Sequence, residues 1–265
     1  MDSQGHEHRD LLRPGGGLFH GPAAYEANTP WSAGRGLLAT IAIVGLSIAV
    51  AMMALWLLGG SEHGPEASRD AKASAAGLRL FAFWQVTVVA MTWAASGLFG
   101  GRVREVLALK PAPGGWRSYA MALVLLAVLQ AAMSVVQFAT RSGDLYVDLR
   151  PFVDIIRGPD WELAALVIGI GAPLSEELLF RGFLLSALAG TRLGFWGGAV
   201  LASGLWTVLH AGYSAVGILE VFLVGLFFSW LLWRTGSLRV PVFCHAVYNL
   251  LIVLALRFAD LPSPA

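Results

Sequence analysis

Charged residues are scarce in this chain of 265 residues. Asp, Glu, Lys and Arg make up 13% of it, 57% of the residues are hydrophobic, and the mean hydropathy is +0.67. A soluble domain carries about 25% charged residues. The scarcity of charge therefore excludes an ordinary soluble domain. It indicates an integral membrane protein built of helices, because helices satisfy their own backbone hydrogen bonds in lipid.

Further absences narrow the function classes. The net charge is only +1, so we expect no nucleic-acid partner. Cys244 is the single cysteine, which excludes an internal disulfide. No signal-peptide pattern opens the chain, and no internal repeat supports an inverted-repeat transporter.

Long apolar runs take the place of charge. We predict an all-α bundle of seven transmembrane helices, or eight if the fourth region is split, around a polar intramembrane cavity. Each run is roughly long enough for a hydrocarbon core of about 30 Å. The expected spans are residues 37–58, 80–99, 118–139, 162–189, 195–211, 214–233 and 240–257.

The chain divides into four parts. Residues 1–35 are polar and rich in glycine and proline, which predicts a disordered N-terminal tail. Residues 36–159 hold about three membrane helices with their loops, residues 160–257 hold the remaining helices, and residues 258–265 form a C-terminal tail.

The loops differ in charge. Basic residues gather at 102–117, at Arg192 and at 234–239, and a short amphipathic helix is expected at Val103–Leu109. The loop at 141–161 is acidic, and that at 60–78 is polar with both signs. The positive-inside rule therefore places the N-terminal tail in the cytoplasm, and we expect a cell membrane of bacterial type.

Two glutamates and an arginine interrupt the fourth apolar run. Charge in such a run costs a few kcal/mol per group. Glu177 and Arg181 are i and i+4 on a helix, so we predict a structural ion pair between them. Glu176 points roughly 100° away and is left free for chemistry.

The same run also carries helix-breaking residues. Gly169, Gly171 and Pro173 predict a kink or a re-entrant break before the glutamates. Ser175 is then placed to cap a new helix, which would set both glutamates at the positive end of the helix dipole.

Two histidines lie in apolar segments, His210 and His245. Trp206 lies one turn before His210, and Asn249 lies one turn after His245 on the same face. Buried separately in lipid these groups would each be a cost, so we expect them to gather with Glu176 around one wet cavity.

Two nearby residues have simpler interpretations. Glu220 is expected near a helix end at the membrane–water interface, where a charged side chain costs little free energy. Cys244 points about 100° away from its neighbour His245 on a helix, so a small buried apolar role is expected.

Three motifs together resemble those of the CPBP (Abi) family. They are Glu-Glu-x-x-x-Arg at 176–181, an aromatic residue followed four residues later by His at 206–210, and His-x-x-x-Asn at 245–249. This family contains the CAAX prenyl endopeptidases and bacterial relatives linked to bacteriocin processing or immunity. The resemblance covers about residues 160–257, which it makes a catalytic core, and Trp206 stands where the family usually has Phe.

The resemblance implies a membrane-embedded endopeptidase of the glutamate type, without a cofactor. Glu176 and His210 would activate a water molecule, while His245 and Asn249 would hold the carbonyl oxygen. Glu177, Arg181 and Trp206 would support these groups structurally and electrostatically. The implied substrate is a membrane-associated or lipidated protein or peptide, cleaved near the bilayer.

Two alternatives stay open. Glu176, His210 and His245 would suit the three ligands of a catalytic zinc, although the contiguous His-Glu-x-x-His pattern of zinc proteases is absent. A transport-type or bacteriocin-immunity protein without catalysis would also carry buried ionisable groups.

Overall fold

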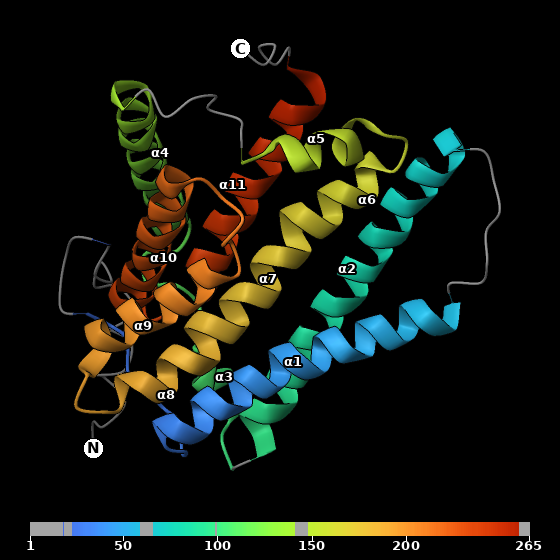
Figure 1. The fold of residues 1–265 in the computed structure, drawn as a ribbon. Helices are drawn as coiled ribbons and strands as arrows, with labels where there is room; N and C mark the ends of the chain where they lie inside the picture. The colour runs from blue at the N-terminus through green and yellow to red at the C-terminus, as the bar shows by residue number, and fades with distance from the viewer. Residues whose placement is uncertain (1–17, 19–22, 59–65, 99, 141–147, 260–265) are drawn as a thin grey trace, which may run out of the picture.

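The computed structural model describes Leu18 and residues 23–58, 66–98, 100–140 and 148–259, apart from the side chains of 55, 58 and 66–75. All regular structure in these residues is helical, which confirms the all-α fold class (Figure 1). The α-helices are α1 (Ala33–Leu58), α2 (Glu66–Leu98), α3 (Val103–Val106), α4 (Trp116–Ala139), α5 (Arg150–Arg157), α6 (Trp161–Leu166), α7 (Ala172–Glu176), α8 (Leu185–Ala189), α9 (Gly194–Val208), α10 (Ala215–Thr235) and α11 (Arg239–Phe258). Two π-helical segments, η2 (Val167–Gly171) and η3 (Glu177–Leu184), join α6, α7 and α8.

Six helices in the described residues are long and apolar enough to cross a membrane. The prediction of seven or eight spans is therefore wrong. The expected fifth span at 195–211 is the 15-residue helix α9, which is only about 22 Å long. It ends at Val208 because the chain turns there and Ser214 caps the next helix, accepting a hydrogen bond from Gly217 N.

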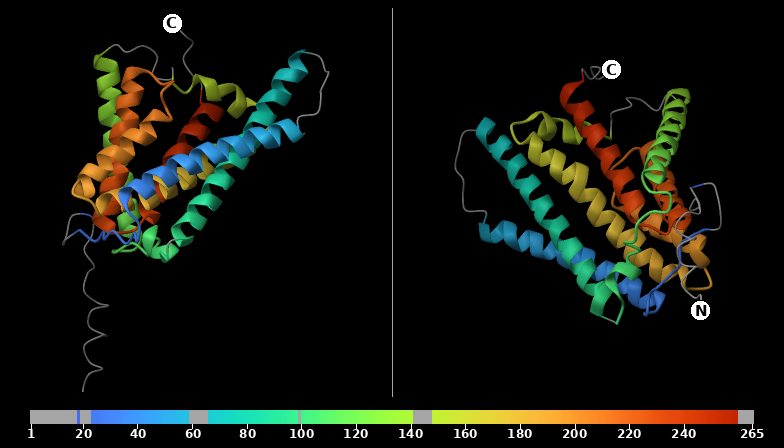
Figure 2. Two further views of the ribbon diagram at one scale, coloured as in Figure 1. Left: turned by 60° about the horizontal axis from the view of Figure 1, so that its bottom comes forward. Right: turned by 180° about the vertical axis from the view of Figure 1, so that it is seen from behind.

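One span, Trp161–Ala189, forms the centre of the molecule (Figure 2). In its most apolar stretch 56% of the residues are buried, against 17–39% in the other five spans. α1 and α2 pack against it on one side and α9 to α11 on the other (Figure 1). The remaining spans expose many large apolar side chains, as helices that face lipid do.

This central span is continuous, so the predicted break before the glutamates is wrong. The π-helical segment η2 ends at Gly171, two residues before Pro173. A proline lacks the N–H for an i→i−4 bond and crowds that carbonyl, and a wide π turn absorbs both effects. Ser175 caps no new helix, and its hydroxyl donates to Ala172 O at 3.0 Å instead.

The two glycines of η2 allow close helix packing. A Cβ on Gly169 would collide with Leu250 of α11, and one on Gly171 would collide with the side-chain oxygen of Gln85 of α2. Gln85 Nε2 donates to Val167 O at 3.1 Å, so α2 holds the π turn directly. These glycines therefore allow neighbouring helices to approach the central span closely. They do not interrupt the span.

Several predicted loops are shorter than expected. α2 begins at Glu66, inside the predicted loop 60–78, because its first residues are good helix formers. α5 lies inside the predicted loop 141–161, and α3 ends at Val106 instead of Leu109. Part of the predicted loop 60–78 and part of the predicted loop 141–161 lie outside the described residues.

The predicted N-terminal tail, residues 1–35, lies mostly outside the described residues, but its described end is packed against the bundle. Tyr25 N donates to Trp233 O at 3.2 Å, and the hydroxyls of Thr29 and Ser186 lie 2.7 Å apart. Residues 23–32 are therefore part of the folded molecule, unlike the disordered tail expected there. Of the predicted C-terminal tail, only Phe258 and Ala259 are described.

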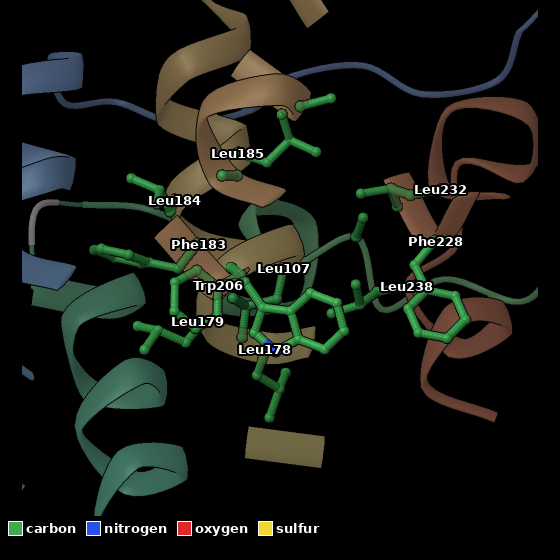
Figure 3. Packing of buried hydrophobic residues seen from close by; sticks show 14 of the residues in the cluster. Leu107, Leu178, Leu179, Phe183, Leu184, Leu185, Trp206, Phe228, Leu232 and Leu238 are labelled. Atoms are coloured by element: carbon green, nitrogen blue, oxygen red, sulfur yellow. The ribbon is translucent and has the colours of Figure 1, made fainter. Parts of the chain in front are cut away.

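The main hydrophobic core surrounds η3 and α8 at the end of the bundle that also carries α3 (Figure 3). Leucine and phenylalanine side chains of the central span pack there against α9, α10 and the turns that follow α3 and α10. The labelled members are Leu107, Leu178, Leu179, Phe183, Leu184, Leu185, Trp206, Phe228, Leu232 and Leu238. This packing fixes the segment that carries Glu177 and Arg181.

Candidate active site

A cavity of about 370 Å³ lies between the central span, α4, α5, the turn after α9, α10 and α11. The four residues expected to act in catalysis all line it. They are Glu176, His210, His245 and Asn249. The structure thus brings together the three motifs, which come from three different segments of the chain.

Glu177 and Arg181 form the expected ion pair. Arg181 Nη1 lies 3.1 Å from Glu177 Oε1, and both side chains are fully buried. The same oxygen also lies 3.0 Å from His245 Nδ1, a contact that the sequence did not suggest. Since a carboxylate only accepts hydrogen bonds, His245 donates from Nδ1, and its Nε2 is directed toward Glu176.

Glu176 points into the cavity, away from Glu177. Its side chain is 12% exposed, and its Oε2 accepts a hydrogen bond of 2.7 Å from Trp206 Nε1. His245 Nε2 lies 4.0 Å from the same oxygen. The two adjacent glutamates therefore face different partners, as the 100° rotation between neighbours on a helix predicts.

His210 lies in the turn after α9. Its Nδ1 lies 3.2 Å from Trp206 O. A carbonyl oxygen only accepts, so the proton is on Nδ1 and the Nε2 lone pair is available. His210 sits in this turn because α9 is short, so it need not lie at the far end of a full span.

Asn249 is held by the π turn. Its Nδ2 donates to Ile168 O at 3.0 Å, which uses one of its two N–H groups and leaves the second. Ile168 belongs to η2, so the segment before the glutamates also orients the last motif residue.

Several polar groups in the cavity were missed or misjudged from the sequence. Glu220, expected at the interface, lines the cavity and accepts hydrogen bonds from Gln137 (3.1 Å) and Tyr248 (3.2 Å). Its position in the apolar segment 214–233 was the feature of the sequence that could have indicated a place in the cavity. Tyr248 and Gln137 have no spacing that sets them apart from other polar residues.

Asp148 and Tyr213 also line the cavity. Asp148 accepts hydrogen bonds from the backbone N (2.6 Å) and the hydroxyl (2.8 Å) of Ser214, and so fixes the start of α10. Burial, with the charges of Glu176, Asp148 and Glu220, raises the pKa of Tyr213 to about 12. Tyr213 therefore keeps its proton at neutral pH and presents a hydrogen-bond donor to the cavity.

The alternative zinc ligands are Glu176, His210 and His245, which all line the cavity. Among the described residues, no group of three His, Cys, Asp or Glu side chains is arranged to hold a metal ion. Glu176 Oε2 is engaged by Trp206. As placed, the side chains of Glu176, His210 and His245 do not converge as three ligands around one point.

A comparison with protein families finds a match in the segment that carries the three motifs. Residues 159–251 match the family described as type II CAAX prenyl endopeptidase Rce1-like. The predicted resemblance is thereby confirmed for this segment. The match begins within one residue of the expected start of the core at residue 160 and includes all three motifs.

Curated relatives cover the same region. An uncharacterized 24.3 kDa protein of Escherichia coli is 40% identical over 89 residues, which are 33% of this chain and 41% of that protein. The UPF0177 protein YxdF of Lactococcus lactis is 26% identical over 94 residues, 36% of this chain and 50% of that protein. The chain thus spans half or less of the length of these relatives, and no solved structure matches it.

Proposed function

We propose that the chain is an intramembrane endopeptidase that hydrolyses a peptide bond in a membrane-associated or lipidated protein or peptide. The convergence of Glu176, His210, His245 and Asn249 on one cavity carries this proposal. The family match at residues 159–251 supports the reaction class. The bilayer and the substrate chain are the partners that this function requires.

Glu176 and His210 act on the attacking water. The Oε1 atom of Glu176 and the Nε2 lone pair of His210 are the available bases on the cavity wall. One of them takes a proton as the water oxygen bonds to the scissile carbonyl carbon. The C–N bond then breaks, and the same proton passes to the leaving amine, so the enzyme returns to its starting state.

His245 and Asn249 stabilise the carbonyl oxygen as it becomes negative. Asn249 offers its second amide N–H, and His245 donates from Nε2 when its ring carries both protons. Glu177, held by Arg181, fixes the His245 ring through Nδ1. Removing one oxyanion donor typically lowers kcat by about 10²–10³-fold.

The test is cleavage by purified protein. The probe is an internally quenched peptide ending in a farnesylated Cys-aliphatic-aliphatic-X sequence, compared with the same peptide without the farnesyl group. We expect cleavage of at least one peptide by the wild type. It should be lost in Glu176→Gln and His210→Ala and kept in Glu162→Gln, which alters an exposed residue at the start of α6.

Two other outcomes would count against the proposal. No cleavage, or cleavage that survives both cavity variants, would favour the non-catalytic immunity or transport function. Cleavage that depends on stoichiometric zinc would favour the metalloprotease. The comparison of the two peptides shows whether the lipid is needed.

The orientation in the membrane is also a proposal. We place the basic loops and the N-terminal tail on the cytoplasmic side of a bacterial-type cell membrane. The charge bias of the loops supports this placement.

A further inference from the structure

Trp206 contacts two charged residues of the central span, Glu176 and Arg181. Its Nε1 donates to Glu176 Oε2 at 2.7 Å, and its ring centroid lies 4.3 Å from Arg181 Cζ. The Trp206 side chain is only 3% exposed, so the indole ring is largely shielded from water. Its ring centroid lies 5.1 Å from that of His210 and 5.6 Å from that of His245, and both pairs are T-shaped.

The contact with Arg181 replaces missing hydrogen bonds. Arg181 is fully buried, and its Nε and Nη2 atoms have no hydrogen-bond partner among the described residues. The face of an aromatic ring attracts a cation, most strongly when water is excluded. Trp206 thus stabilises the buried guanidinium with its face and orients Glu176 with its edge.

The hydrogen bond also distinguishes the two oxygens of Glu176. Oε2 is occupied by the indole N–H, so Oε1 is the oxygen left to take a proton from water. A hydrogen bond to a charged acceptor is short and directional. It holds the carboxylate in one orientation, which a base needs if it is to meet water and peptide together.

We propose that Trp206 is a positioning residue that fixes the orientation of the Glu176 carboxylate through its indole N–H. This inference rests on the proposed function for its catalytic consequence. The contact itself can be tested without any cleavage.

The contact is tested by NMR of protein labelled with ¹⁵N in its ten tryptophan indoles. The Trp206 resonance is assigned by its loss in Trp206→Phe. We expect it to move upfield in Glu176→Gln, because the charged acceptor becomes neutral, and to stay in place in Glu162→Gln. An unmoved resonance in Glu176→Gln overturns the inference whether or not the wild type cleaves a peptide.

The catalytic consequence is tested by replacing Trp206 with benzothienylalanine, which has the same shape but sulfur in place of N–H. We expect kcat to fall about tenfold with KM within about twofold, since only the hydrogen bond to a charged group is lost. Trp206→Phe should lower kcat at least as much. Trp93→Phe, at an exposed position of α2, should leave it unchanged.

Full kcat in the isostere would overturn the inference even where the wild type is active. A shifted indole resonance in a protein that cleaves neither peptide would support the contact and count against the proposed function alone. Loss of folded protein in Trp206→Phe, with the isostere folded and impaired, would support both roles of the side chain.

Discussion

At the scale of single residues, Glu177 binds two partners at once. One oxygen accepts from both Arg181 (3.1 Å) and His245 (3.0 Å), while Oε2 has no hydrogen-bond partner among the described residues. The sequence predicted the pair with Arg181 from the i, i+4 spacing. It could not predict the contact with His245, because that contact joins residues 68 positions apart.

Glu177→Gln is expected to lower stability more than Glu176→Gln. It leaves the buried Arg181 charge without its counter-ion, and breaking a buried pair costs about 3–5 kcal/mol. Glu176 is partly exposed, so its replacement should leave the fold intact and stop cleavage. Thermal unfolding and folded yield in detergent measure the first effect. A stable Glu177→Gln variant without activity, beside an active Glu176→Gln, would reverse the two roles.

Gly225 of α10 makes room for Arg181. A Cβ there would lie 2.9 Å from Arg181 Nη2 and 3.0 Å from the Cβ of Ser203. We therefore expect Gly225→Ala to destabilise the protein by about 1–3 kcal/mol through overpacking. Gly204→Ala on α9 is the matched control, because nothing lies within 4 Å of its Cβ. Equal melting temperatures for the two variants would contradict the role of Gly225.

At the scale of elements, the π-helical segment η2 shows what a single sequence can and cannot predict. Gly169, Gly171 and Pro173 correctly marked an irregular position before the glutamates. Whether the irregularity is a break or a π turn depends on partners from distant helices. Gln85 of α2 binds Val167 O and Asn249 of α11 binds Ile168 O, and single-sequence patterns do not reveal such partners.

Gly171→Ala and Gln85→Ala are expected to couple. The new Cβ would strike Gln85 Oε1, displace the side chain and break its bond to Val167 O. Gln85→Ala removes the obstacle, so the double variant should be more stable than the sum of the single effects predicts. A double-mutant cycle of unfolding free energies should give a coupling of about 0.5–3 kcal/mol. Strict additivity would show that the two residues do not meet.

α9 explains the other error at this scale. Its apolar run suggested a span to residue 211, and the helix ends at Val208. Periodicity detects the helix, while the turn at His210 is set by Ser214 and by Asp148, which lies 66 residues away. The motifs therefore predicted which residues would line one cavity, but they did not predict the turn that positions His210.

At the scale of the whole molecule, the cavity is lined by residues inside and outside the segment that matches the family. Gln137 of α4 and Phe152 of α5 line it, and both precede the segment that matches the family. The three motifs supply one part of the lining, whereas these other residues come from a region without a recognised pattern.

We expect cleavage to be independent of a tightly bound metal. An amide such as Asn249 is a poor zinc ligand and suits an oxyanion donor better. Metal content of the purified protein, and cleavage before and after strong chelation, are the measurements. Stoichiometric zinc whose removal stops cleavage, and whose return restores it, would establish the metalloprotease mechanism instead.

The basic connections meet at one end of the bundle. Trp196 at the start of α9 and Trp233 at the end of α10 have ring centroids 5.5 Å apart, and Leu238 N donates to Ala108 O at 2.9 Å. At the opposite end Arg157 of α5 binds the carbonyl oxygen of Leu256 at 2.9 Å (Figure 1). α9 and α10 thus form a hairpin that begins and ends on one side, so the loss of a predicted span leaves the loop sides unchanged.

Cysteine labelling should locate these two ends. Cys244 is fully buried, so the native thiol is expected to stay silent toward a membrane-impermeant maleimide. Pro111→Cys, in the basic connection between α3 and α4, should react only after the membrane is opened, because the positive-inside rule places this end in the cytoplasm. Asp154→Cys, exposed on α5, should react in intact cells. The reverse pattern would invert the proposed orientation, and labelling of both sites in intact cells would show that they do not lie on opposite sides of the membrane.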